Sequence, residues 1–114
     1  MAAASPEELE TILEDALLLH DDAAVAALFE DRGVLVAGAG CVRNRHRAAE
    51  VLLQRDYVAS AHLVTVVRDI AVVFGDHTVN VSCRGPDRSW RLAVAIVMPL
   101  TTSAEATRRH PPAD

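Results

Sequence analysis

The spacing of apolar residues changes once along this chain, from helical in the first half to strand-like in the second. Up to about residue 58 the apolar residues recur every three or four positions, whereas later they form runs rich in Val and Ile. These runs cover residues 62–74, 78–84 and 90–98, with short Gly-containing connections between them. Because such short connections join antiparallel neighbours, the second half predicts an antiparallel meander, and its long first run requires a bend or bulge.

Three capping residues predict where the helices of the first half begin. The sequence Ser5-Pro6-Glu7-Glu8 has the capping-box pattern, so we expect a helix from there to about residue 20, with Glu7, Glu10, Glu14 and Asp15 largely on its solvated side. Asp21 or Asp22 caps a second, shorter helix reaching Phe29, and Asn44 introduces a third. Between these last two, residues 34–37 and 41–43 predict a short hairpin. Helices followed by a meander indicate an α+β domain.

Length and composition suit a single domain. The chain has 114 residues, of which 51% are hydrophobic and 24% charged, as in ordinary globular proteins. We expect one domain over residues 1–100 and a flexible tail over 101–114. There is no signal-peptide pattern and no apolar run of about 20 residues, so we expect a cytoplasmic protein with no membrane partner. Cys41 and Cys83 are then expected to be free, buried and inert thiols.

The charge pattern limits the possible partners. All eleven basic residues are arginine and the formal net charge is −5, which excludes lysine Schiff-base chemistry and argues against a nucleic-acid partner. Arg43, Arg45 and Arg47 crowd the start of the third helix, where the helix dipole disfavours positive charge. We expect an anion there, supplied by the acidic face of the first helix, by a neighbouring subunit or by an acidic ligand group.

The order of elements and several short motifs resemble the nuclear transport factor 2-like superfamily, which includes SnoaL-like polyketide cyclases and ketosteroid isomerases. The stretch from Leu19 to Phe29, followed by Gly33-Val34-Leu35-Val36, resembles the family's end of helix one, helix two and first strand. Val42-Arg43-Asn44-Arg45 resembles its entry to helix three. Asp69-Ile70-Ala71-Val72 and Val79-Asn80-Val81 resemble its central strands. The resemblance covers roughly residues 9 to 98.

The resemblance implies a cone-shaped, curved antiparallel sheet packed against three N-terminal helices around one apolar pocket. It also implies that the outer sheet face is used for dimerisation. The last family strand is not evident after Met98. The catalytic residues of ketosteroid isomerases are absent, since approximate alignment places Ala37 or Gly38, Glu14 and Ile96 at their positions.

If Ile96 faces the pocket, strand alternation predicts which side chains line it. The predicted lining is Trp90, Leu92, Val94, Ile96 and Met98, with Val79, Val81 and Cys83 across the ladder. Tyr57 could add an orienting hydroxyl, and His62 and Asp69 are the candidate acid–base groups. For these three a surface position is the alternative, and for the apolar residues it is a filled core.

We therefore expect a domain that binds a small hydrophobic metabolite. The resemblance implies a SnoaL-like isomerase, cyclase or dehydratase of polyketide-type metabolism, and the alternative is a non-catalytic ligand-binding or dimerisation module. The alanine-rich, all-arginine composition suggests a bacterial source. We expect a homodimer through a sheet face that includes Thr78, Asn80, Ser82 and Ala93. No cofactor is expected, and no metal, because the histidines are not at ligand spacing.

Overall fold

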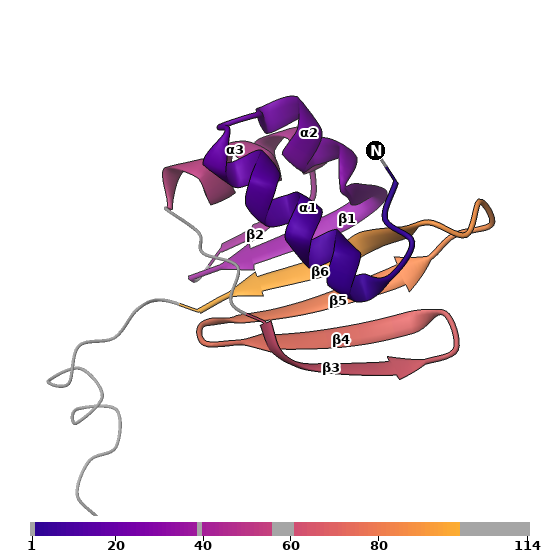
Figure 1. The fold of residues 1–114 in the computed structure, drawn as a ribbon. Helices are drawn as coiled ribbons and strands as arrows, with labels where there is room; N and C mark the ends of the chain where they lie inside the picture. Colours follow the sequence, from indigo (N-terminus) through magenta and orange to yellow (C-terminus); the bar gives the residue numbers. More distant parts are fainter. Residues whose placement is uncertain (1, 39, 56–60, 99–114) are drawn as a thin grey trace, which may run out of the picture.

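The computed structural model describes residues 2–38, 40–55 and 61–98, apart from the side chains of residues 61 and 62. Two helices, a hairpin and a third helix come first, and four strands follow (Figure 1). The elements are α1 Pro6–Leu18, α2 Asp22–Ala27, β1 Phe29–Ala37, β2 Gly40–Val42, α3 Arg45–Gln54, β3 Ala61–Val67, β4 Ile70–Gly75, β5 Thr78–Arg84 and β6 Trp90–Val97. The expected tail and Tyr57 lie outside the described residues.

The predicted helix caps are confirmed. The Ser5 hydroxyl accepts a hydrogen bond from the backbone N–H of Glu8 at 3.0 Å, and the Asp21 carboxylate accepts one from that of Ala24 at 3.1 Å. The side-chain oxygen of Asn44 accepts from two N–H groups at the start of α3. The expected extent of α2 is wrong, because the helix ends at Ala27 and Phe29 already opens β1.

The sheet has the strand order β2-β1-β6-β5-β4-β3. Residues 61–97 form the predicted antiparallel meander, β3 to β6. The sheet as a whole is mixed, not antiparallel throughout, because β6 returns beside β1 in the parallel direction. The last strand of the meander therefore becomes a central strand, and it joins the hairpin β1–β2 to the rest of the sheet.

The long run over residues 62–74 is two strands instead of one bent strand. A tight turn at Arg68 and Asp69 separates β3 from β4, and Arg68 adopts a left-handed backbone with φ 57°. The backbone N–H of Arg84 donates to the carbonyl of Asp69 at 2.8 Å, which fixes this turn against the end of β5. The meander thus has four strands where the sequence pattern indicated three. The expectation that the family's last strand is missing after Met98 falls on residues outside the described part of the chain.

The three helices lie on one side of the sheet (Figure 1). The face that they cover, called here the inner face, holds the core. The largest fully buried side chains of this core include Leu9 and Leu13 of α1, Phe29 and Leu35 of β1, and Leu92 of β6. Among the described residues, no helix has the length and apolar character needed to cross a membrane.

Candidate functional site

A polar group is buried in the middle of the inner face, beneath α1. The register places Asn80 of β5 in one cross-strand row with Leu35, Ala95 and Val73. All four are buried, and Asn80 is only 1% exposed. An amide in the centre of an apolar row requires hydrogen-bond partners, because burial without them costs free energy.

Glu10 of α1 is the partner of Asn80 across the two layers. The amide Nδ2 of Asn80 donates to the two carboxylate oxygens of Glu10 at 3.1 and 3.4 Å. Glu10 is only 7% exposed, so the expectation that it faces solvent is wrong. Burial raises the pKa of Glu10 above its usual 4.5, and the hydrogen bond from Asn80 opposes that rise in part. A buried carboxyl with a shifted pKa is typical of functional sites.

A buried hydroxyl lies next to this pair on the same strand face. Ser82 is two residues beyond Asn80 on β5, which places both side chains on the inner face. It is 1% exposed, and its Oγ has no hydrogen-bond partner among the described residues. We call Glu10, Asn80 and Ser82 the interior polar cluster. It places a carboxyl, an amide and a hydroxyl together in the interior beneath α1.

The predicted facing of β5 is reversed in the structure. Thr78, Asn80 and Ser82 are buried under the helices and do not form an outer dimerisation face. The residues expected to line the pocket, Val79, Val81 and Cys83, instead lie half-buried on the opposite face. The expectation assumed that the apolar side of the strand points inward, and it fails because the outer side of this sheet is apolar as well.

A bulge in β6 divides the predicted lining of that strand. Trp90 and Leu92 lie on the inner face and are buried. The register then shifts, since Ser82 pairs with Leu92 whereas Val81 pairs with Val94. The extra residue, Ala93, moves Val94 and Ile96 to the outer face.

Of the two nominated acid–base residues, only Asp69 has a described side chain, and it lies away from the interior polar cluster. Asp69 lies in the exposed β3–β4 turn, where its carboxylate pairs with the guanidinium of Arg84 and Nε of Arg84 donates to it at 2.9 Å. His62 belongs to β3, but its side chain lies outside the described part of the structure. Met98 follows β6 and is 41% exposed, away from the buried core.

The outer face of the sheet, called here the open face, is lined by apolar side chains. Helices cover only the opposite side (Figure 1). Four open-face side chains are more than two-fifths exposed, namely Leu63 at 56%, Val67 at 66%, Ile70 at 51% and Phe74 at 41%. The cross-strand rows of this face are Cys41-Val36-Ile96-Val79-Phe74-Leu63, Val34-Val94-Val81-Val72-Thr65 and Arg91-Cys83-Ile70-Val67, so the face is apolar apart from Thr65 and Arg91 at the ends of two rows. Exposed apolar surfaces of this extent mark interaction sites.

Two of the arginines at the start of α3 form ion pairs with nearby carboxylates. These carboxylates do not belong to α1, whose acidic face was one of the expected partners. Arg45 pairs with Asp31 of β1 at 3.1 Å, and Arg47 pairs with Glu50 of its own helix at 2.8 Å. Both pairs are largely solvent-exposed, so each contributes little to stability.

The described residues contain two free cysteines and no metal-binding group. Cys41 is exposed, contrary to the expectation of burial, and Cys83 is half-buried, so that desolvation raises its pKa. In residues 2–38, 40–55 and 61–98, no three His, Cys, Asp or Glu side chains gather as ligands.

No protein-family model matches the chain, and no curated protein matches it significantly. Several solved structures do match. A ketosteroid isomerase-like protein from Erwinia carotovora atroseptica superposes with a TM-score of 0.68 at 19% identity, over 84% of this chain and 94% of that chain. A Thiobacillus denitrificans protein described as a calcium/calmodulin-dependent protein kinase type II association domain gives a TM-score of 0.70 at 17% identity, over 89% and 99%. A Nostoc punctiforme domain of unknown function with a cystatin-like fold gives 0.67 at 14% identity, over 90% and 79%.

These likenesses establish the class of fold. Three helices on one face of a six-stranded mixed sheet form the α+β fold of nuclear transport factor 2-like and ketosteroid isomerase-like proteins. The resemblance inferred from the sequence motifs is thus confirmed at the level of the fold. At identities below 20% the likeness carries no activity over to this chain.

Helical spacing in the sequence carries a signal for the burial of Glu10. Glu10 lies four residues after Pro6 and three before Leu13, both of which are buried, so it belongs to the buried stripe of α1. Helical spacing alone therefore placed a carboxyl in the core. No comparable signal identified Ser82, because the alternation of β5 suits either facing.

Proposed function

We propose that this domain binds a small, largely apolar molecule between its helices and the inner face of its sheet. The interior polar cluster would contact the polar group of that molecule. The observation that carries this proposal is the buried hydroxyl of Ser82, which has no partner among the described residues. Leaving such a group unpaired costs about 1–3 kcal/mol, and a ligand that hydrogen-bonds to it removes that cost.

Glu10 gives the cluster an acid–base group. Because burial raises its pKa above the ordinary value, this carboxyl holds its proton to a higher pH than an exposed one, which suits a group that takes up and returns a proton. That is the requirement of the isomerisations, cyclisations and dehydrations implied by the sequence resemblance. The polyketide-type substrate rests on the resemblance alone. In a non-catalytic binding protein the same carboxyl would serve only as an anchor.

A pair of fluorescent probes that differ by one hydroxyl tests the binding proposal. We expect 2-naphthol to bind more tightly than naphthalene, and we expect Glu10→Gln to weaken 2-naphthol at least about fivefold while leaving naphthalene unchanged, since it alters one hydrogen bond. Glu14→Gln is the matched control, because Glu14 lies on the exposed side of the same helix. Equal affinities for both probes, or a Glu10→Gln protein that binds 2-naphthol normally, would contradict the proposal.

A second proposal concerns the open face, which we infer pairs with the same face of a second copy. Six strands about 4.8 Å apart, each presenting about six residues at 3.3 Å spacing, cover roughly 24 Å by 20 Å. Two such faces together bury about 1,000 Å², which is near the minimum expected of a biological interface and corresponds to a weak dimer. The apolar rows of the face support this pairing. One similar structure is described as an association domain, which also favours it.

Sedimentation equilibrium at micromolar concentration tests the self-association. Val81 lies on a central strand within the open face, so Val81→Glu buries a carboxylate in the interface, and we expect monomers. Leu19→Glu is the matched control, because Leu19 is 77% exposed at the end of α1 and lies away from the sheet. A monomeric parent protein, or a dimer that survives Val81→Glu, would refute the pairing.

A further inference from the structure

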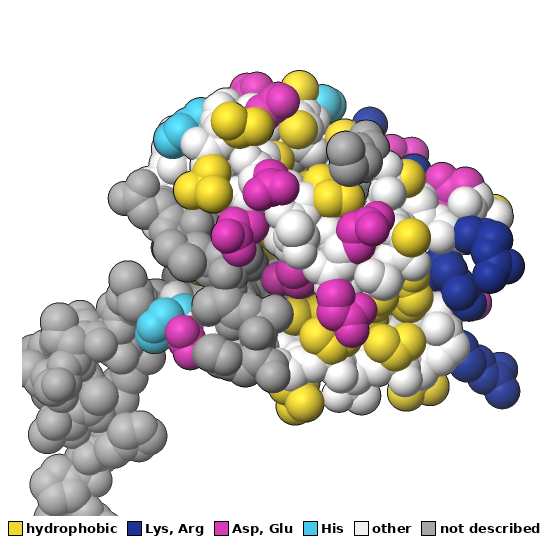
Figure 2. Space-filling model, in the orientation of Figure 1, with side chains coloured by type: hydrophobic (Ala, Val, Ile, Leu, Met, Phe, Trp, Pro, Cys, Tyr) yellow, Lys and Arg dark blue, Asp and Glu magenta, His cyan; other side chains and the backbone are white. Residues whose placement is uncertain are grey.

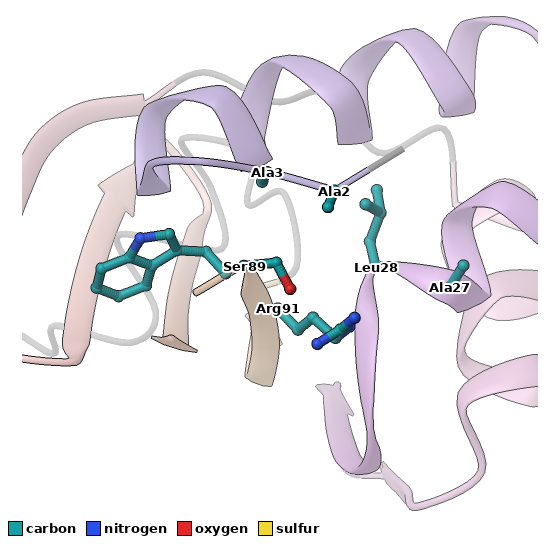
Figure 3. Close-up of a pocket in the computed structure, with 7 residues that line it drawn as sticks. Ala2, Ala3, Ala27, Leu28, Ser89 and Arg91 are labelled. Carbon is teal, nitrogen blue, oxygen red and sulfur yellow. The ribbon is translucent and has the colours of Figure 1, made fainter. Parts of the chain in front are cut away.

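A cavity of about 220 Å³ lies at the end of the sheet where the N-terminal segment crosses β6. Its lining comes from three parts of the chain that are distant in sequence: Ala2 and Ala3, then Ala27 and Leu28 at the end of α2, then Ser89 to Arg91 where β6 begins. Figure 3 shows Arg91 extending from β6 across the gap toward β1, below Leu28. The cavity is separate from the interior polar cluster, because the two share no residue.

Backbone hydrogen bonds hold the walls of this cavity in place. The N–H of Trp90 donates to the carbonyl of Ala3 at 2.9 Å, and the N–H of Leu92 donates to the carbonyl of Leu28 at 2.7 Å. These bonds attach the N-terminal segment and the start of β1 to the same strand, β6. The cavity is therefore formed before any ligand binds, which lowers the entropic cost of binding.

Arg91 is the charged group of the cavity, and Asp87 holds its side chain. Nη2 of Arg91 donates to Oδ2 of Asp87 at 3.0 Å. The other oxygen of Asp87 accepts from the N–H and the hydroxyl of Ser89, at 3.1 and 2.8 Å. These bonds lower the pKa of Asp87 to about 2, so it stays ionised at neutral pH. The remaining N–H groups of the guanidinium have no partner among the described residues.

The two turns near the cavity are basic, although the whole chain is acidic and the carboxylates of Glu8 and Glu30 also lie close to the lining. The β3–β4 and β5–β6 turns lie at this end of the sheet and carry Arg68, Arg84, Arg88 and Arg91, against the two carboxylates Asp69 and Asp87. Figure 2 shows arginines gathered at this edge, whereas the carboxylates spread over the helical layer. These two turns with their adjoining strand ends carry four arginines against two carboxylates, which favours anions at this end of a molecule whose net charge is −5.

We propose that this cavity binds a small carboxylate with a short apolar tail. The guanidinium of Arg91 matches the planar geometry of a carboxylate and forms charge-assisted hydrogen bonds with it. The methyl groups of Ala2, Ala3 and Ala27 and the side chain of Leu28 supply the apolar walls for the tail. A phosphate monoester would satisfy the arginine but would place no group against these walls. The site stands independently of ligand binding under α1.

Titration of the ¹⁵N-labelled protein with butyrate, followed by NMR at constant ionic strength, tests this site. We expect saturable shifts of the backbone amides of Ala3, Ala27, Leu28 and Arg91, and none with butyramide, which has the same shape without the charge. Arg91→Gln should weaken butyrate at least about tenfold, as expected for the loss of charge-assisted hydrogen bonds. The control Arg88→Gln, which removes an exposed charge from the same turn, should change the affinity less than about twofold.

A second pair of variants keeps the test decisive if Arg91→Gln alters the turn that holds Asp87. Ala27 is exposed at the mouth of the cavity, so Ala27→Leu should block the tail and weaken butyrate by a similar factor. Ala23→Leu, at an exposed position of the same helix, is its control. Three results would overturn the proposal. They are equal shifts with butyramide, non-saturable shifts spread over all surface arginines, and butyrate binding that survives both Arg91→Gln and Ala27→Leu. If inorganic phosphate binds with the same affinity as butyrate, the apolar walls do not contribute to binding, and that step of the proposal is wrong.

Discussion

The burial of Glu10 makes a quantitative prediction about stability and pH. Glu10→Gln keeps the shape of the side chain and leaves an oxygen that accepts from the Asn80 amide, but it removes the carboxyl that titrates. In the native protein the raised pKa means that the folded state holds the Glu10 proton to higher pH than the unfolded state, where the pKa is near 4.5. The contribution of Glu10 to stability is therefore complete below that pH and is lost as pH rises through the folded-state pKa.

The size of the effect follows from proton linkage. The free energy of unfolding of Glu10→Gln minus that of the native protein should be constant at low pH. Above about pH 4.5 it should rise with a slope of at most about 1.4 kcal/mol per pH unit, and it should level off above the folded-state pKa. The height of the final plateau, divided by about 1.4 kcal/mol, gives the pKa shift itself.

Urea denaturation of both proteins between pH 3.5 and pH 8 measures this difference, and the other titrating groups cancel from it when their pKa values are the same in both proteins. Glu14→Gln is the control and should stay within about 0.5 kcal/mol of the native protein throughout, as exposed substitutions do. A Glu10→Gln difference that is flat over the whole range would refute the reasoning. A difference that falls with pH would show instead that hydrogen bonding outweighs desolvation.

Three further predictions concern local features. Asn44→Ala should lower stability by about 1 kcal/mol in thermal denaturation, because two backbone N–H groups of α3 lose their acceptor; an unchanged melting temperature would contradict this. Gly33→Ala should cost about 1–3 kcal/mol, because an added Cβ would lie 3.0 Å from the carbonyl oxygen of Glu30, whereas Gly40→Ala, with its nearest contact at 3.6 Å, should be nearly neutral in the same assay. Asp87→Asn should be less stable than the native protein at pH 7, and this difference should vanish as pH falls from 3.8 to about 2, since Asp87 then becomes protonated in both states; a difference that persists in acid would exclude the ion pair as its cause.

Local signals in the sequence predicted the helical half well. Ser5, Asp21 and Asn44 each cap the helix that they were expected to cap, because a cap depends on a side chain and on backbone groups two or three residues away. The end of α2 was not predicted, because Phe29 is drawn into the sheet by its pairing with Leu92, far along the chain. Tertiary pairing here overrides a helical pattern.

The facing of the strands could not be deduced from alternation alone. In β5 one side is apolar and the other polar, and the usual rule turns the apolar side inward. The structure does the reverse because Glu10 provides a partner for Asn80, while the open face accepts valines. A hydrogen bond across 70 residues of sequence therefore decides which face of the strand is the interior. Such a pairing is not visible in the local pattern of either segment.

The central position of β6 has a consequence for how the chain emerges from the ribosome. β1 begins at Phe29, but the strand that pairs with it along its other edge is complete only at Val97. During synthesis the helices and the β1–β2 hairpin are made first, and the backbone N–H and C=O groups on the open edge of β1 stay unpaired until most of the remaining domain has been translated. The nascent chain is therefore expected to depend on chaperones until β6 is released, and to fold by late closure of the sheet.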